Sequence, residues 1–421
     1  MTESESRILV RGSGPLSGSV RVAGAKNSVL KLMAATTLAS GRFTLRNVPA
    51  ISDVGWMCDL LTAMGARCER PAPHEVAVIS PDAHDPVAPY ELVERMRASI
   101  VVLGPLVARF GEARVALPGG DDFGPRPVDM HLRGLEALGA DIEIRHGEII
   151  ARADGLVGAE VVFDFPSVTA TENVMMAAVL AKGTTTIENA AREPEIADLA
   201  AFCNRMGAQI LGAGTSTITV EGVDELRAVD HTVIPDRIEA ATYLAAVAVA
   251  GGEITIDDAR PDHMHMFCQK LGEMGVRTSP APGGIWAMRG PDRLRSIDVS
   301  TLPYPGVATD TKPLFVAMLS VADGVGIVTE NLFAGRFRYI DELVRMGADI
   351  RTDSQHAVVR GRPSLSGAPV RAPDIRAGAA LVVAGLAAEG ETVLSGVDHI
   401  DRGYEDLVGK LAGLGCDIER R

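Results

Sequence analysis

Residues 241–250 read ATYLAAVAVA, and residues 251–256, which follow directly, read GGEITI. A helix that is apolar on nearly every side is typically buried, whereas a surface helix has one polar face. Glycine is common where a helix ends, and a short run in which apolar and polar residues alternate is typical of a strand. The stretch therefore predicts a buried helix that ends at a glycine and is followed by a strand.

This order recurs six times at a spacing of about seventy residues, which indicates internal repeats. In each unit a glycine follows the apolar helix; these are Gly41, Gly111, Gly183, Gly252, Gly324 and Gly390. A later glycine ends an amphipathic stretch and precedes an alternating one; these are Gly65, Gly139, Gly207, Gly275, Gly347 and Gly415. We therefore predict six units, each built from a buried helix, a strand, an outer helix and a strand.

The composition excludes several classes of protein. Hydrophobic residues make up 47% of the 421 residues and charged residues 23%, so the chain is globular, not disordered. The net charge of -14 disfavours nonspecific binding of nucleic acid or anionic membranes. No apolar run reaches the ~20 residues that a membrane helix needs. The acidic segment 1–6 lacks the basic and apolar parts of a secretion signal, so we expect a cytoplasmic protein.

The cysteines and histidines predict neither a disulfide framework nor a metal site. The five cysteines are odd in number and form no CxxC motif, so we expect reduced thiols, most of them in the core. His263-Met264-His265 resembles a pair of metal ligands, but no further ligand has a suitable spacing, and surface histidines are the favoured interpretation. We therefore expect no bound metal.

The residues that begin the buried helices are unexpectedly polar. The positions fourteen residues before the first set of glycines are Asn27, Arg97, Thr169, Ile238, Asp310 and Arg376, and Arg237 precedes Ile238. Helix N-termini carry free N–H groups and the positive end of the helix dipole, so several of them together would form an anion site. Ordinary capping explains Asn27 or Thr169. Arginine is unfavourable at a helix N-terminus, so Arg97, Arg237 and Arg376 are harder to explain by structure alone.

Charged residues also gather in four short segments. Residues 24–28 read GAKNS, 117–127 read LPGGDDFGPRP, 372–376 read APDIR and 399–404 read HIDRGY. The second segment is too rich in Gly and Pro for a helix or a strand, and a solvated turn is an alternative interpretation. Structural salt bridges are the alternative for the Asp and Arg of the last two segments.

Five cations of these segments and helix N-termini could meet in one site: Lys26, Arg97, Arg126, Arg376 and Arg402. Such a cluster suits a substrate with a phosphate and a carboxylate, because guanidinium groups bind both with paired hydrogen bonds. Asp310 and Asp121 would then supply a general base and a general acid. The phosphate-binding patterns GxxxxGK[ST] and GxGxxG are absent, which disfavours nucleotide hydrolysis and dinucleotide redox chemistry.

Nine motifs, taken in order, resemble those of the enolpyruvyl transferase family, which includes 5-enolpyruvylshikimate-3-phosphate synthase, and within it the UDP-N-acetylglucosamine 1-carboxyvinyltransferases. The resemblance runs from about residue 7 to the C-terminus. The motifs are GAKN at 24–27, MRAS at 96–99, LPGG at 117–120, RPVD at 126–129, NAAREPE at 189–195, PDR at 235–237, TD at 309–310, DIR at 374–376 and HIDRGY at 399–404.

The resemblance implies an α/β fold of two inside-out domains, each with three βαβαββ repeats about a pseudo-threefold axis. The first domain would span residues 25–233 and carry a flexible loop at 117–127. The second would combine residues 1–24 with 234–421. The active site would lie in the interdomain cleft, where the N-termini of buried helices point, and closure of the domains would exclude water from the reacting centre.

The implied reaction transfers the enolpyruvyl group of phosphoenolpyruvate to the 3′-hydroxyl of UDP-N-acetylglucosamine and releases phosphate, without a cofactor. This is the first committed step of peptidoglycan synthesis. Lys26, Arg97 and Arg126 would hold the phosphate, and Arg376 and Arg402 the carboxylate. The catalytic set would comprise Asp121, Asp310, Lys26 and Arg402, with Asp310 as base for the 3′-hydroxyl.

The remaining implied residues bind the nucleotide sugar. Asn27 would address the sugar together with Asp310, and the uridine pocket would be formed by Pro127, Val128, Asp129, Met130 and His131. Ser167 and Val168 would lie near the diphosphate. Arg237, Leu332 and Asp374 match positions of the substrate site without a specific role.

The sequence departs from the common family pattern at several positions. Thr169 stands where glycine is usual, Lys312 where Gln is common, and Ala334-Gly335 replaces a more acidic stretch. Bulk or charge there could change the acceptor, so one alternative is an enolpyruvyl transferase for another uridine nucleotide, such as UMP in nucleoside-antibiotic synthesis. A noncatalytic protein that binds nucleotide sugars is the other alternative. We expect a monomer or a weak oligomer that binds neither nucleic acid nor membrane.

Asp121 occupies the position of the family's loop cysteine, which fosfomycin alkylates, so we predict an active, fosfomycin-insensitive enzyme. The variant Asp121→Cys should become sensitive, because a thiolate is the nucleophile that the drug requires. Turnover after incubation with fosfomycin, and the mass of the loop peptide, measure this. A covalent adduct on the wild-type loop would contradict the prediction.

Overall fold

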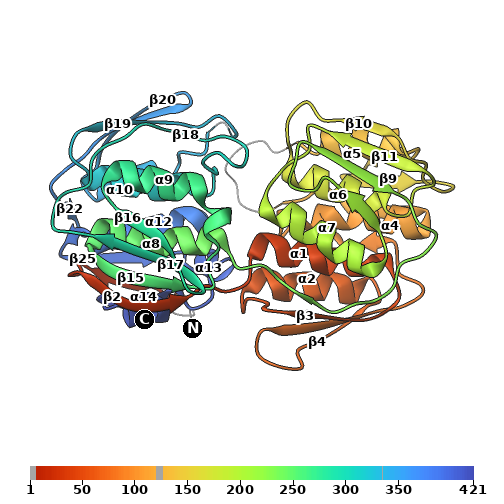
Figure 1. The fold of residues 1–421 in the computed structure, drawn as a ribbon, viewed down its shortest axis with the longest axis horizontal. Coiled ribbons are helices and arrows are strands. Elements are labelled where there is room, and N and C mark those ends of the chain that lie inside the picture. The colour runs from red at the N-terminus through yellow and green to blue at the C-terminus, as the bar shows by residue number, and fades with distance from the viewer. Residues whose placement is uncertain (1–5, 120–126, 334) are drawn as a thin grey trace. The chain divides into compact units, whose positions relative to one another are not determined.

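The computed structural model describes residues 6–119, 127–333 and 335–421. The chain divides into two compact units, which we call the central unit and the terminal unit (Figure 1). The central unit consists of residues 24–119 and 127–234, and the terminal unit of residues 6–23 with 235–421. Each unit has its own hydrophobic core.

The central unit contains three four-stranded sheets with one common order of strands. An edge strand runs parallel to its neighbour, and the two further strands are antiparallel. The sheets are β14 (His231–Thr232), β3 (Gly41–Arg46), β5 (Glu75–Ser80) and β4 (Arg67–Glu69); β6 (Val87–Ala88), β7 (Glu112–Ala116), β9 (Glu148–Arg152) and β8 (Asp141–Arg145); and β10 (Glu160–Val162), β11 (Thr184–Glu188), β13 (Thr217–Glu221) and β12 (Gln209–Leu211).

The terminal unit repeats this arrangement three times. Its sheets are β2 (Leu16–Arg21), β15 (Gly252–Asp257), β17 (Gly284–Arg289) and β16 (Arg277–Ala281); β18 (Val299–Ser300), β19 (Val325–Thr329), β21 (His356–Arg360) and β20 (Asp349–Asp353); and β23 (Pro369–Arg371), β25 (Glu391–Ser395), β1 (Ile8–Arg11) and β26 (Ile418–Arg420). The short strands β22 (Leu365–Ser366) and β24 (Ala388–Glu389) form a further parallel pair.

Strands from distant parts of the chain complete one sheet in each unit. In the central unit β14, at the end of the unit's sequence, pairs with β3 near its beginning. In the terminal unit β1 lies between β25 and β26, so Ile8 pairs with both Leu394 and Arg420. The backbone groups of Arg7 and Arg421 exchange two hydrogen bonds of 2.7 and 2.8 Å. Both ends of the chain therefore belong to one sheet.

Two sets of helices alternate along the chain. The buried set is α1 (Lys26–Ala35), α4 (Leu103–Phe110), α6 (Val168–Ala178), α8 (Arg237–Ala250), α10 (Lys312–Val321) and α12 (Ile375–Leu386). The outer set is α2 (Ser52–Ala63), α5 (Asp129–Ala137), α7 (Pro194–Met206), α9 (His265–Met274), α11 (Ile340–Arg345) and α14 (Leu407–Gly413). Shorter helices are η1 (Thr36–Leu38), α3 (Tyr90–Val93), η2 (Arg97–Val102), η3 (Pro261–His263) and α13 (Val397–Asp401).

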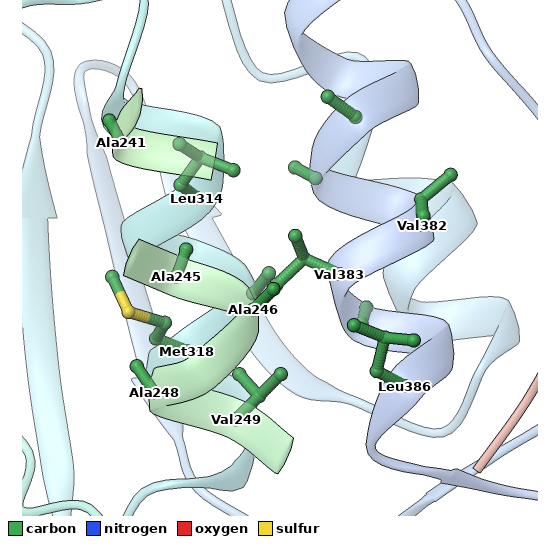
Figure 2. Close-up of a cluster of buried hydrophobic side chains, with 14 of the residues drawn as sticks. Ala241, Ala245, Ala246, Ala248, Val249, Leu314, Met318, Val382, Val383 and Leu386 are labelled. Atoms are coloured by element: carbon green, nitrogen blue, oxygen red, sulfur yellow. The ribbon is translucent and has the colours of Figure 1, made fainter. Parts of the chain in front are cut away.

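The buried helices of each unit pack on one another, with the sheets outside them (Figure 1). In the terminal unit α8, α10 and α12 are in mutual contact. In the central unit α1 and α6 both contact η2, which leads directly into α4. Figure 2 shows Ala246 of α8 beside Val383 of α12, and Ala245 on the side of α8 where Leu314 and Met318 lie. Because alanine occupies little space, the helices can approach closely and fill their contacts without voids.

The predicted repeat is confirmed, with one correction. All twelve glycines of the two predicted sets have positive φ angles, between 72° and 121°, a conformation that side chains with a Cβ rarely adopt. The single strand predicted after the outer helix is wrong for most repeats, where a hairpin such as β16 and β17 follows. Pro282 and Gly283 form the turn of that hairpin. Because the turn has only two residues, the two strands read as one continuous alternating run in the sequence.

Two further observations bear on the sequence expectations. Among the residues that the structure describes, no helix combines the length and the apolar character needed to cross a membrane. The five cysteines are free thiols, with Cys203 and Cys416 buried and Cys58, Cys68 and Cys268 partly buried.

The contact between α4 and α6 generates a test of the helix packing. A Cβ at Gly104 would overlap the backbone oxygen and Oδ1 of Asn173, so Gly104→Ala should lower the free energy of unfolding by about 1–3 kcal/mol. Gly272→Ala is the matched control, because Gly272 is exposed in α9 with nothing near its Cβ position. This control should raise stability by about 0.5–1 kcal/mol. Urea unfolding measures both, and equal shifts would refute the packing argument.

Candidate active site

Lys26 is the first residue of α1, and its side chain reaches the first turn of α2. Its Nζ lies 3.0 Å from Oδ2 of Asp53, whose side chain is fully buried. The carboxylate is favourable there because it lies at the positive end of α2 and beside a cation. The ion pair therefore holds an ammonium group at the N-terminus of α1, beside Asn27.

The second turn of α1 carries another lysine, Lys31, which faces α6. Its Nζ donates to the backbone oxygen of Asn27 at 2.6 Å and lies 3.6 Å from Oε2 of Glu172. The Glu172 side chain is 0% exposed, and neither carboxylate oxygen accepts a hydrogen bond in the described part of the chain. Burial raises its pKa to about 8, although the charge of Lys31 acts in the opposite direction. Glu172 therefore carries a proton through much of the neutral range.

Arg97, at the beginning of η2, binds both ends of the Gly- and Pro-rich loop. One guanidinium nitrogen donates to the backbone oxygen of Pro118 at 3.5 Å, and the other terminal nitrogen donates to that of Pro127 at 3.2 Å. Because one guanidinium group binds both carbonyl groups, Pro118 and Pro127 both lie close to the N-terminus of η2. The guanidinium thus lies where the loop leaves and rejoins the unit.

His131 connects α5 with α6 through two hydrogen bonds. Its Nδ1 accepts from the side-chain amide of Asn173 at 3.0 Å, so Nε2 carries the proton and donates to Oγ1 of Thr169 at 3.1 Å. Burial, with the nearby charge of Arg97, lowers the pKa of His131 to about 3. The imidazole is therefore neutral, and the hydroxyl of Thr169 is bound within the unit.

The other predicted nucleotide-binding residues of this unit lie at the N-termini of α5 and α6. Ser167 is the N-cap of α6, and its hydroxyl accepts the N–H of Ala170 at 3.4 Å. The rest are exposed or partly buried around the first turns: Pro127, Val128, Asp129, Met130 and Val168. The predicted residues Asp121 and Arg126 lie outside the described residues.

In the terminal unit, Arg237 is the first residue of α8. Its guanidinium lies over the ring of Tyr304, 5.5 Å from the ring centroid, and both residues line a small pocket beside α8. The preceding Asp236 caps the helix by accepting the N–H groups of Ile238 and Glu239 at 2.7 and 3.1 Å. The cap orients the first turn on which Arg237 lies.

Asp310, two residues before α10, is paired with two arginines. Its Oδ1 accepts from Nη1 of Arg336 at 2.9 Å, and its Oδ2 accepts from Nε of Arg376 at 3.3 Å. Asp310 is 26% exposed, whereas the side chains of both arginines are nearly buried. The carboxylate therefore reaches solvent between two buried cations, an arrangement that keeps it ionised.

Arg376, in the first turn of α12, contacts Tyr404 in addition to Asp310, and one of its guanidinium nitrogens donates no hydrogen bond in the described chain. Its guanidinium lies 5.5 Å from the ring centroid of Tyr404, whose hydroxyl is hydrogen-bonded to Thr242 of α8 at 2.8 Å. Its Nη1 is buried and without a hydrogen-bond partner in the described chain. Asp374 is the N-cap of the same helix, and Arg402 follows α13 and is partly buried. A buried, unsatisfied guanidinium N–H is a site for an anionic acceptor.

Lys312 and Leu332 both contact the buried carboxylate of Glu330. Lys312 is fully buried in the first turn of α10, with Nζ 2.9 Å from Oε2 of the equally buried Glu330. Burial lowers the pKa of Lys312 to about 8, against the effect of Glu330. Leu332 is partly buried, and its backbone N–H donates to Glu330 at 2.8 Å. The charge of Lys312 is thus compensated within the unit.

The structure groups the predicted residues by unit and adds partners that the sequence analysis missed. Lys26, Arg97 and His131 lie at or beside the N-termini of the helices that meet in the central unit. Arg237, Asp310 and Arg376 do so in the terminal unit. The missed partners are Asp53, Glu172, Glu330 and Arg336. An acid within a helix whose other residues are all uncharged was a usable signal for Glu172, whereas Arg336 lies in a segment without regular pattern.

Each group of residues has a defined chemical capacity. The central unit presents an ammonium and a guanidinium group at helix N-termini, which suits an anion such as a phosphate. The terminal unit presents a carboxylate that can accept a proton and a guanidinium group with an open donor. In the described ranges, no three His, Cys, Asp or Glu side chains cluster so as to hold a metal ion.

Known proteins similar to this chain are enolpyruvyl transferases. The chain matches the sequence model of EPSP synthase (3-phosphoshikimate 1-carboxyvinyltransferase) over residues 10–411. UDP-N-acetylglucosamine 1-carboxyvinyltransferase 1 of Caldanaerobacter subterraneus is 48% identical over 99% of this chain and 100% of the relative. UDP-N-acetylglucosamine 1-carboxyvinyltransferase of Halorhodospira halophila is 51% identical over 98% of this chain and 99% of the relative.

Two solved structures share the architecture. The enolpyruvyl transferase NikO from Streptomyces tendae has a TM-score of 0.87 and 27% sequence identity, with 99% of each chain covered. EPSP synthase from Acinetobacter baumannii has a TM-score of 0.73 and 16% identity, over 99% of this chain and 100% of that chain. The second likeness concerns the fold alone. The expected α/β fold of two inside-out domains, each with three repeats, is confirmed.

The raised pKa of Glu172 predicts a pH-dependent stability. A carboxyl group with a pKa of about 8 in the folded protein and about 4.5 unfolded stabilises the fold below pH 4.5. That contribution is lost as the pH rises through 8. The variant Glu172→Gln should therefore gain stability relative to the wild type between pH 5 and 8, by at most about 1.4 kcal/mol per pH unit.

Thermal unfolding of both proteins at pH 5, 6.5 and 8 measures this difference. The control is Glu221→Gln, since Glu221 is exposed on β13. A difference between Glu172→Gln and the wild type that stays constant with pH would show that Glu172 is ionised throughout.

Proposed function

This chain belongs to the EPSP synthase family, and we propose on that premise that it is a UDP-N-acetylglucosamine 1-carboxyvinyltransferase. It transfers the enolpyruvyl group of phosphoenolpyruvate to the 3′-hydroxyl of UDP-N-acetylglucosamine and releases phosphate. Relatives that bear this name are 48% and 51% identical over almost the whole chain. The observation that carries the proposal is the carboxylate of Asp310 between the guanidinium groups of Arg336 and Arg376.

Asp310 is the general base in the proposed reaction. It takes the proton of the 3′-hydroxyl as that oxygen forms a bond to C2 of phosphoenolpyruvate, while a proton is added to C3. The tetrahedral adduct then loses phosphate from C2 and a proton from C3, which restores the enol double bond. The two arginines favour the ionised form of Asp310, the form that can accept a proton.

Cations bind the two anionic groups of phosphoenolpyruvate. Lys26, Arg97 and Arg126 hold the phosphate, and Arg376 and Arg402 hold the carboxylate. The ion pair of Lys26 with Asp53 supports this role, because it fixes the ammonium group before substrate arrives. Nη1 of Arg376, which has no hydrogen-bond partner among the described residues, supports the carboxylate assignment. Asp121 is the proposed donor of the proton to C3.

The remaining proposed residues bind the nucleotide sugar. The uridine lies against residues 127–131, and the diphosphate lies near Ser167 and Val168. The N-terminus of α6 supports the second assignment, because free backbone N–H groups there suit an anion. Asn27 addresses the sugar. Arg237, Leu332 and Asp374 complete the proposed set without individual roles.

Two departures from the family pattern are compatible with this acceptor. The hydroxyl of Thr169 is bound to His131, and the charge of Lys312 is compensated by Glu330. The Thr169 hydroxyl and the Lys312 charge therefore both have partners within the protein, and neither needs a group of the acceptor as its partner. The alternative acceptor, another uridine nucleotide such as UMP, is not favoured, because relatives that are 48% and 51% identical over almost the whole chain bear the name UDP-N-acetylglucosamine 1-carboxyvinyltransferase.

The cellular role follows from this reaction. We propose that the enzyme works in the cytoplasm, as a monomer or a weak oligomer, at the first committed step of peptidoglycan synthesis. Loss of this step would affect cell shape and cell division. Insensitivity to fosfomycin, from Asp121 in the loop, belongs to the same proposal.

Phosphate release tests the proposed function directly. The enzyme should release phosphate from phosphoenolpyruvate with UDP-N-acetylglucosamine as acceptor, and Asp310→Asn should lower kcat by about 10²- to 10⁴-fold, because the amide cannot take the proton. Calorimetry should show that this variant still binds the nucleotide sugar. Turnover with UMP alone would contradict the acceptor, and full activity of Asp310→Asn would contradict Asp310 as the base. Binding of the nucleotide sugar without any release of phosphate by the wild type would favour a protein that only binds.

A further inference from the structure

Glu330, the residue after β19, holds the backbone of the segment that follows it. Its Oε1 accepts the hydroxyl proton of Thr301 at 2.7 Å and the backbone N–H groups of Leu332 and Phe333 at 2.8 and 3.2 Å. Burial would raise the pKa of Glu330, but Lys312 and the hydrogen bonds outweigh it and lower the pKa. The carboxylate is therefore an ionised, fully buried anchor for residues 331–333.

The other oxygen of Glu330 orients Thr309, the neighbour of Asp310. Oε2 accepts the hydroxyl proton of Thr309 at 2.7 Å. A hydroxyl group has one proton, so the oxygen of Thr309 can only accept from its other partner. That partner is Nη1 of Arg336, at 3.0 Å. Glu330 thus turns the lone pairs of Thr309 toward the guanidinium group of Arg336.

Lys312 fixes the other end of Arg336. Its Nζ is bound to Oε2 of Glu330 at 2.9 Å and also donates a short hydrogen bond to the backbone oxygen of Arg336. The ammonium group lies over the ring of Phe337, 3.9 Å from the ring centroid, so its remaining face is covered as well. Arg336 is therefore held by its carbonyl group through Lys312 and by its guanidinium group through Thr309.

We propose that Lys312 and Glu330 are positioning residues for Asp310, which they hold through Arg336. The same Nη1 that binds Thr309 donates to Oδ1 of Asp310 at 2.9 Å. Both side chains of the pair are 0% exposed, so they act through Arg336 and not on a substrate. The inference deepens the proposed function and rests on it, since it concerns the orientation of the proposed base.

The two charges of the pair must compensate each other in this arrangement. Removal of one partner would leave the other charge buried and uncompensated, which is strongly destabilising locally, whereas two neutral hydrogen-bonding groups would avoid that cost. The charged or titratable groups that face Lys312 are Glu330, Arg336, Asp374 and Tyr339. The pKa of Lys312, about 8, lies above neutral pH, so the pair is ionised under neutral conditions.

Four variants test the inference: Lys312→Met, Glu330→Gln, the double variant Lys312→Gln with Glu330→Gln, and the control Lys410→Gln. Lys410 forms an ion pair of 2.7 Å with buried Glu239 in the same unit but has no recorded bond to Asp310 or Arg336. For each protein, kcat, the KM for both substrates, the pH profile of kcat and the folded fraction are measured well below the unfolding temperature.

Each single variant should lower kcat by about 10- to 100-fold and change the KM for UDP-N-acetylglucosamine by less than about threefold, because misplacement of a base affects the reacting step. The acidic limb of the kcat profile should move to higher pH by about half a unit or more, because Asp310 loses the firm contact of one cation. The double variant should recover kcat to within about fivefold of the wild type, and the control should match the wild type.

Three results would overturn the inference. Activity that falls only in proportion to the folded fraction, with an unmoved pH profile, would show a merely structural pair. Unchanged kcat in the single variants would also overturn the inference. So would a loss of kcat in Lys410→Gln as large as the loss in the single variants. These results are distinct from failure of the proposed function, in which the wild type itself releases no phosphate with UDP-N-acetylglucosamine and both proposals fall together.

Discussion

The close packing of three buried helices in each unit is the constraint from which the rest of the structure follows. Helices such as α8 have no face toward solvent, so their side chains are mostly apolar, and many of them small, along almost their whole length. Polar chemistry is then restricted to the first turns, where the helices emerge from the core. Lys26, Arg237 and Arg376 all occupy such turns. The position of the candidate site is thus a consequence of how the core is filled.

Both units contain ion pairs with buried partners, and three of these pairs connect separate repeats. Lys31 of α1 is paired with Glu172 of α6, Arg376 of α12 with Asp310 before α10, and Lys410 of α14 with Glu239 of α8. A buried ion is costly unless an opposite charge and hydrogen bonds surround it, so such pairs tolerate few alternative arrangements. They set the relative register of helices whose alanine surfaces would otherwise allow sliding.

The repeat and the helix N-termini could be predicted because glycine spacing and apolar patterning are local properties of the chain. The positions of Arg97, Asp310 and Arg376 at helix N-termini followed from that spacing alone. The partners could not be predicted in the same way. Arg336 lies 26 residues from Asp310 in an irregular segment. Glu330 acts through the hydroxyl proton of Thr309, and the direction of that hydrogen bond follows only from the three-dimensional structure. Assignments at Asp121 and Arg126 still rest on the resemblance.

The pairing of β1 between β25 and β26 has a consequence for synthesis on the ribosome. The central unit is complete in sequence once β14 has been made, so it can fold while the rest of the chain is still being translated. The terminal unit differs, because residues 8–11 are made long before their partners at 391–394 and 418–420. Its strand β1 must therefore wait, unpaired, while several hundred residues between it and its partners are made, and its sheet closes only after β25 and β26 have followed.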